Sequence, residues 1–120
     1  MSLTTVKTQQ LAKRVGALKG HFTRIHKSLR DRLEDLEKDK ESEVIFNDLL
    51  HWKQKLSDNY DKIMDVYLDL ESGLEEAVWV ETWQQKQEEL VQRFEEVCLQ
   101  VTQAGVQKEN LEKAPGQHLQ

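Results

Sequence analysis

The sequence is poor in residues that cross-link a chain or interrupt a helix. Its 120 residues include one cysteine, one proline and five glycines. The single cysteine, Cys98, excludes an internal disulfide and fits a reducing compartment. No apolar run approaches the roughly 18 residues of a membrane helix, and the first residues lack the apolar stretch of a signal peptide. We therefore expect one soluble, intracellular, cytoplasmic domain without a membrane span.

Charge is abundant instead, since 32% of the residues are charged and only 38% are apolar. That balance suits long helices that each bury one stripe rather than a large globular core. Apolar residues recur in alternating steps of three and four along most of the chain, which predicts amphipathic helices over about 4–38, 42–72 and 75–104. The predicted inner seams are Leu11, Val15, Leu18, Phe22, Ile25, Leu29 and Leu36, then Ile45, Leu49, Trp52, Leu56, Ile63, Val66 and Leu70, then Val80, Trp83, Gln87, Leu90, Phe94, Val97, Val101 and Ala104.

The predicted turns are short. A charged run, 38–43, separates the first two helices, with Ser42 as the N-cap of the second. Gly73 is expected in the left-handed conformation after the second helix, and Gly105 is expected to end the third. Short turns force neighbouring helices to be antiparallel. The predicted fold is an all-α, elongated, up-down-up three-helix bundle with coiled-coil-like packing over residues 1–105, followed by a flexible tail, 106–120.

Some apolar residues lie outside the inner seams. They widen the stripe of the second helix, as expected for a helix that contacts two neighbours or a second molecule. Trp79 stands between two valines near the second turn, where we expect it to be exposed. The candidate surface for self-association or partner binding comprises Phe46, Leu50, Tyr60, Tyr67, Trp79 and Leu99.

The two signs of charge are unevenly distributed. Residues 1–32 carry a net charge of +7 and residues 33–120 a net charge of −12. A basic segment of this kind is typical of binding to nucleic acid or to an acidic surface. The candidate contacts are Lys13, Arg14, Lys19, Arg24, Lys27 and Arg30. Internal pairing in an antiparallel hairpin is the favoured explanation, and its predicted acidic partners are Asp58, Asp61, Asp65, Asp69 and Glu71.

No pattern of catalytic or metal-binding residues is recognisable. His21 and His26 are five residues apart and diverge around a helix, where two zinc ligands would be three or four apart. The sequence contains no glycine-rich phosphate loop and no nucleophile elbow. We therefore expect a protein without enzymatic activity, metal or cofactor.

One segment resembles a known family. The segment 18–25, Leu-Lys-Gly-His-Phe-Thr-Arg-Ile, resembles the K-G-x-x-T-R stretch near the start of Gag-like proteins of BEL/Pao-type retrotransposons. In those proteins an acidic helix follows, similar to the pattern of Leu56, Tyr60, Ile63 and Val66 here. A third helix with tryptophan follows in turn, similar to Trp83, Phe94 and Val97 with Glu76 or Glu81. The resemblance covers about residues 10–100 and implies a coiled-coil region concerned with self-association.

The leading functional prediction is a helical self-association or scaffold module that binds itself or another helical protein. The resemblance adds that this module belongs to the assembly region of a Gag-like protein. A module that binds RNA or an acidic surface through the first helix is the first alternative. A spectrin-like adaptor bundle is the second, because three-helix repeats share this periodicity.

Overall fold

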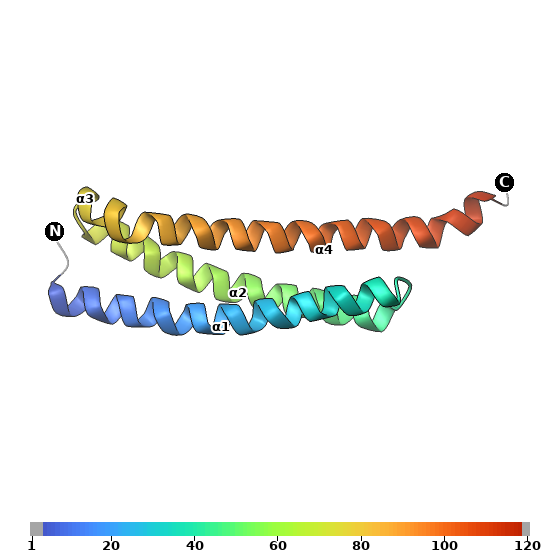
Figure 1. Ribbon diagram of the computed structural model, residues 1–120, viewed down its shortest axis with the longest axis horizontal. Helices are drawn as coiled ribbons and strands as arrows, with labels where there is room; N and C mark the ends of the chain where they lie inside the picture. Colours follow the sequence, from blue (N-terminus) through green and yellow to red (C-terminus); the bar gives the residue numbers. More distant parts are fainter. Residues whose placement is uncertain (1–3, 119–120) are drawn as a thin grey trace.

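The computed structural model describes the backbone of residues 4–118 and the side chains of residues 4–111. Three long helices, α1 (Thr5–Lys38), α2 (Glu43–Gly73) and α4 (Gln85–His118), run up, down and up (Figure 1). A short helix, α3 (Glu76–Trp79), and a π-helical turn, η1 (Val80–Gln84), join α2 to α4. The molecule measures 67 × 22 × 17 Å. The predicted all-α bundle of three long helices is confirmed.

The apolar seams meet in one continuous core. Every predicted seam residue except Val80 and the polar Gln87 is buried or packs against this core. The buried members are Val15, Phe22, Ile25, Leu29, Leu36, Leu49, Leu56, Ile63, Val66, Tyr67, Leu70, Trp79, Leu90, Val97 and Val101. Burial of such side chains contributes about 1.5–3 kcal/mol each before the cost of ordering the chain.

The α1–α2 hairpin is the tightly packed part of the bundle, and α4 lies more loosely against it. The turn between α1 and α2 is short because Ser42 caps α2: its Oγ accepts a hydrogen bond from the Ile45 amide at 3.2 Å. Arg32 bridges the two helices near this turn through an ion pair with Asp48 of α2 at 2.9 Å, and a second ion pair with Asp35 of its own helix, at 2.6 Å, orients its side chain. These contacts hold the hairpin in one register.

A buried asparagine sits in the middle of this hairpin. Asn59 is 4% exposed, and its Nδ2 donates a hydrogen bond to the Leu18 carbonyl of α1 at 3.3 Å. Its Oδ1 makes no hydrogen bond to any described residue. A polar residue in an otherwise apolar seam fixes the register of neighbouring helices at some cost in stability.

Replacing Asn59 by leucine is expected to raise the free energy of unfolding by about 1–3 kcal/mol, because the buried unpaired acceptor disappears and apolar surface fills the seam. Denaturant titration followed by circular dichroism measures the change. Asn47→Leu, at an exposed position of the same helix, is the matched control and is expected to change stability by less than about 0.5 kcal/mol. Destabilisation by Asn59→Leu would show instead that the amide is a net stabilising contact.

The connection between α2 and α4 differs from the prediction at Gly73 and at Val80. Gly73 is the last residue of α2, and no described glycine has a positive φ; the chain leaves the helix through Leu74 in an extended conformation. The third seam begins with Trp79, which is 4% exposed, whereas Val80 is 49% exposed. The π turn explains this shift, because its wider i→i+5 bonding changes the rotation per residue just before the regular seam of α4.

The predicted end of the third helix at Gly105 is wrong, since α4 continues to His118. Gly105 lies against α2: a Cβ placed there would meet Cζ of Phe46 at 3.5 Å. A glycine within a helix costs only about 1 kcal/mol relative to alanine. It does not end α4, because the helix is held by buried residues before and after it, Val101 and Lys108. The segment 106–118, predicted as a flexible tail, is therefore helical, and Figure 1 shows it continuing past the α1–α2 turn.

No helix in the described part of the chain combines the length and apolarity needed to cross a membrane.

Candidate interaction surfaces

Two residues of the predicted partner surface are not on the surface at all. Tyr67 and Trp79 are both buried, and their rings meet edge to face with centroids 6.1 Å apart. Trp83 approaches Tyr67 in the same manner at 6.4 Å. Burial also raises the pKa of the Tyr67 hydroxyl. The prediction that Trp79 is exposed is wrong because the π turn directs it, rather than Val80, toward α2.

Phe46 and Tyr60 are half-buried and hold α4 against α2. The Tyr60 ring stacks on Phe94 with centroids 3.9 Å apart and an interplanar angle of 5°. Desolvation there raises the pKa of the Tyr60 hydroxyl. Phe46 packs against Gly105 and lies under the ammonium group of Lys108, 5.5 Å from the ring centre. These two aromatic residues therefore form part of the bundle itself.

Leu50 and Leu99 do lie on the surface, with exposed fractions of 42% and 58%. Leu50 follows Phe46 by one helical turn and so lies on the side of α2 that faces α4. Leu99 and Val106 are seven residues apart and share one face of α4, and Val106 is 51% exposed. We call the three residues Leu50, Leu99 and Val106 the apolar flank. The sequence analysis missed Val106, although its heptad spacing from Leu99 was a usable signal.

Arg32 of α1 pairs with Asp48 of α2, but among the described side chains the six candidate basic residues form no ion pair within 4 Å with the acidic partners predicted for them. Of the six candidates, Lys13, Arg14, Arg24, Lys27 and Arg30 are exposed and Lys19 is half-buried. Among the described side chains, the ion pairs within 4 Å involve Arg32 and Lys108 instead. The acidic residues Asp58, Asp61, Asp65, Asp69 and Glu71 are all exposed. The first four follow one another on the outer face of α2, because steps of three and four keep them away from its buried seam.

Some of the basic residues meet other basic residues across the α1–α4 boundary. We call this surface the basic groove; it comprises Lys19, His26, Arg30, Lys86 and Arg93. The Arg93 guanidinium lies over the Phe22 ring of α1, 5.4 Å from its centre, and the His26 ring stacks on Phe22 at 5.8 Å. Arg93 of α4 is thereby held beside the face of α1 that carries Lys19 and His26, one turn on either side of Phe22.

Burial and the proximity of other cations lower the pKa of two of these groups. Burial, followed by repulsion from Lys86, lowers the pKa of Lys19, although Glu89 opposes the shift. Burial, with repulsion from Arg93 and Arg30, lowers the pKa of His26. Like charges are therefore held together in the folded chain with little compensation from acidic groups.

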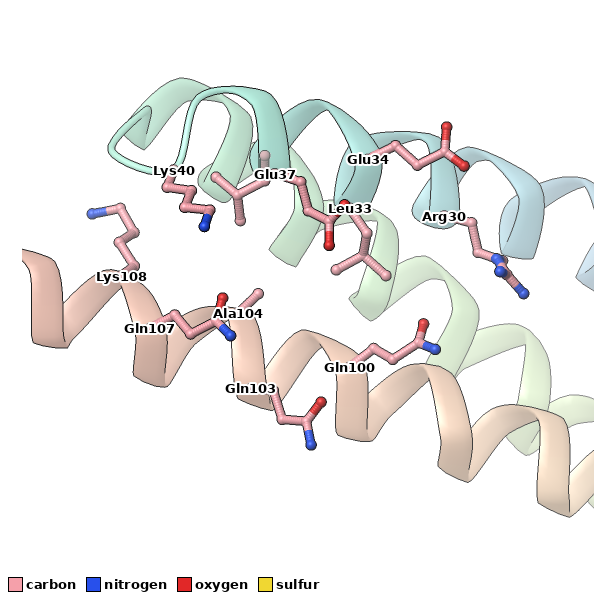
Figure 2. Close-up of a pocket in the computed structure, with 11 residues that line it drawn as sticks. Arg30, Leu33, Glu34, Glu37, Lys40, Gln100, Gln103, Ala104, Gln107 and Lys108 are labelled. Atoms are coloured by element: carbon pink, nitrogen blue, oxygen red, sulfur yellow. The ribbon is translucent and has the colours of Figure 1, made fainter.

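The α1–α4 boundary becomes hollow beyond Arg30. A depression of about 380 Å³ lies there, between the last turns of α1 and the middle of α4. Figure 2 shows Leu33 and Glu37 of α1 and Gln100 of α4 extending into the space between the two helices. Its lining is mainly polar, with Lys40 and Lys108 at the end near the turn. The helices are thus far enough apart to leave a groove rather than a sealed contact.

The described residues contain no group of three or more His, Cys, Asp and Glu side chains placed to hold a metal ion. Cys98 is a half-buried free thiol whose pKa is raised by desolvation, with Lys53 acting in the opposite direction. Since only the thiolate is a good nucleophile, a raised pKa disfavours a nucleophilic role for this cysteine.

The chain matches no protein-family model, no curated protein and no solved structure.

Proposed function

We propose that the protein is a non-enzymatic helical self-association module, and the apolar flank is the observation that carries this proposal. Leu50, Leu99 and Val106 are each more than two-fifths exposed. Leu99 and Val106 lie on the outer face of α4, opposite its buried seam, and Leu50 lies on α2 one turn after Phe46. Apolar side chains gathered on a surface otherwise rich in charge mark sites of protein–protein contact.

The flank suits a contact between two identical copies. A patch of this kind can meet itself across a two-fold axis, since each leucine then packs against the same surface of the other copy. Phe46 and Tyr60, which were predicted to belong to the same surface, are already engaged within the bundle, so the exposed leucines and Val106 are the residues left for a contact. Self-association is also what the resemblance to BEL/Pao-type Gag-like proteins implies, and a cytoplasmic location would keep Cys98 reduced.

The double variant Leu50→Lys/Leu99→Lys is expected to abolish the contact through the apolar flank, because two charges would have to be desolvated in it. Light scattering measures the result: the mass of the unmodified chain should rise above the 14.1 kDa of one copy as concentration increases, and the mass of the variant should rise clearly less at the same concentrations. Val44→Lys is the matched control, since Val44 is exposed but lies on another side of α2 from Phe46.

Two results would contradict the proposal. A constant monomer mass for the unmodified chain would favour the alternative of a spectrin-like adaptor that binds a different helical protein. Equal association of the unmodified chain and the double variant would remove the apolar flank from the contact.

Binding of RNA through α1 is the weaker function on geometric grounds. Lys13, Arg24 and Lys27 face outward, whereas Lys19 and Arg30 turn toward α4, so the six candidate residues do not form one continuous face. Among the described side chains, the residues of the basic groove make no ion pair within 4 Å with the acids of α2, which leaves the groove available to an acidic ligand.

A further inference from the structure

Opposite faces of the bundle carry opposite charge. On α2, the exposed carboxylates Asp58, Asp61, Asp65 and Asp69 follow one another in steps of three and four. We call these four residues the acidic ridge. Because their positions lie opposite the buried seam of α2, the ridge points away from both other helices. The basic groove lies between α1 and α4, on the face of the bundle away from α2.

Neither surface is neutralised within the chain. The four ridge carboxylates make no ion pair within 4 Å among the described side chains, and only Asp58 accepts a side-chain hydrogen bond, from Gln54 at 3.0 Å. Lys62 is next to Asp61 in sequence but lies about 100° around the helix.

The groove is likewise uncompensated. Glu89 is the acidic group that acts on Lys19, against two cations, Lys86 and Arg93. Glu34 and Glu37 lie farther along, at the hollow end. The groove therefore keeps a positive balance in a chain whose net charge is −5.

The two surfaces match in length and shape. Lys19 and Arg30 are eleven residues apart, as are Asp58 and Asp69, so each surface extends about 16 Å along its helix. A helix presents a convex row of side chains, and the space between two loosely packed helices is concave. The hollow that begins at Arg30 leaves such a space open at one end of the groove.

We propose that the basic groove of one copy binds the acidic ridge on α2 of a second copy. This inference rests on the proposed self-association and assigns it a second, electrostatic surface distinct from the apolar flank. Because groove and ridge are different surfaces on opposite faces, the contact is heterologous, and each copy keeps a free ridge and a free groove for the next. Joined with a two-fold contact at the apolar flank, it would extend dimers into larger assemblies.

Two charge-reversal variants test the contact. Lys86→Glu/Arg93→Glu reverses exposed residues of the groove, and Asp61→Lys/Asp65→Lys reverses the centre of the ridge. Each variant alone is expected to lose assembly beyond the dimer, with at least about tenfold weaker association, because like charges then face each other. Circular dichroism verifies that both remain helical.

Mixing the two variants is the decisive measurement. The acidic groove of one variant then meets the basic ridge of the other, and the mixture is expected to regain the larger assemblies, as measured by sedimentation velocity. Lys13→Glu/Arg14→Glu is the matched control: it changes the net charge by the same amount as the groove variant, outside the groove, and should assemble like the unmodified chain. Raising NaCl from about 50 to about 500 mM should weaken the unmodified assemblies.

The outcomes separate the two proposals. Loss of association in Leu50→Lys/Leu99→Lys alone, with both charge variants unaffected, would overturn the groove–ridge contact and leave self-association standing. A mixture that fails to reassemble would overturn the contact as well. If the groove variant assembles normally but loses binding of a fluorescein-labelled single-stranded RNA that the unmodified chain binds, the groove is a nucleic-acid site instead. A chain that is monomeric at every concentration would refute both proposals.

Discussion

Replacing Phe22 by alanine is expected to lower the free energy of unfolding by about 3–5 kcal/mol. Phe22 is fully buried, and its ring is the point where α1 meets α4, with His26 stacked on it and Arg93 above it. The truncation removes apolar burial and leaves a cavity that two helices on a tight hairpin cannot collapse to fill. Small domains have only about 5–15 kcal/mol of stability in total, so the loss is severe.

Urea denaturation followed by circular dichroism measures this change. Phe22→Leu is the control, because it preserves most of the volume and is expected to cost less than about 1.5 kcal/mol. A cost below about 1 kcal/mol for Phe22→Ala would mean that α4 does not rest on this ring in solution.

Replacing Trp79 by alanine is the second change with a large expected effect. It should lower the free energy of unfolding by about 3–5 kcal/mol. The indole is buried against Tyr67, and it is the first core residue after the turn from α2. Its loss removes the contact that anchors the short connection α3–η1 to the hairpin. Thermal and urea melts of the variant measure the loss of stability.

Val80→Ala is the matched control for Trp79, because the two residues are adjacent and Val80 is about half exposed. It is expected to change stability by less than about 0.5 kcal/mol. A larger loss of stability for Val80→Ala than for Trp79→Ala would mean that Val80 is the buried residue. That result would support the seam predicted from the sequence and contradict the π turn.

The pattern of apolar residues predicted most of the fold because helix periodicity alone determines which side chains share a face. Phe22, Leu56 and Val97 lie in the core where the steps of three and four placed them. The same steps pass through position 59 between Leu56 and Ile63, so the burial of Asn59 was available from the sequence. The predicted seam passed directly from Leu56 to Ile63 and so left Asn59 out.

Features that depend on contacts between helices were not predictable in the same way. Gly105 was predicted to end the helix, but it lies within α4, where the ring of Phe46 from α2 packs against it. The π turn at Val80–Gln84 has no sequence signature and shifts the seam from Val80 to Trp79. Gly73 needed no left-handed conformation because Leu74 continues the chain in an extended one.

The candidate surfaces were predicted only in part for the same reason. Leu50 and Leu99 are exposed as expected, whereas Tyr67 forms part of the core because Trp79 of α3 and Trp83 of η1 cover it. The basic groove was not foreseeable from α1 alone, because half of it, Lys86 and Arg93, comes from α4. Only the placement of α4 beside α1 brings the two sets of charges together.

The elongated shape of the bundle has a hydrodynamic consequence. Its radius of gyration is 19.1 Å, whereas a compact chain of 120 residues would have about 14 Å. A compact protein would need about 300 residues to reach the radius observed here. In gel filtration a single copy should therefore elute ahead of a globular protein of the same mass. Absolute mass, not elution volume, distinguishes one copy of this rod from two.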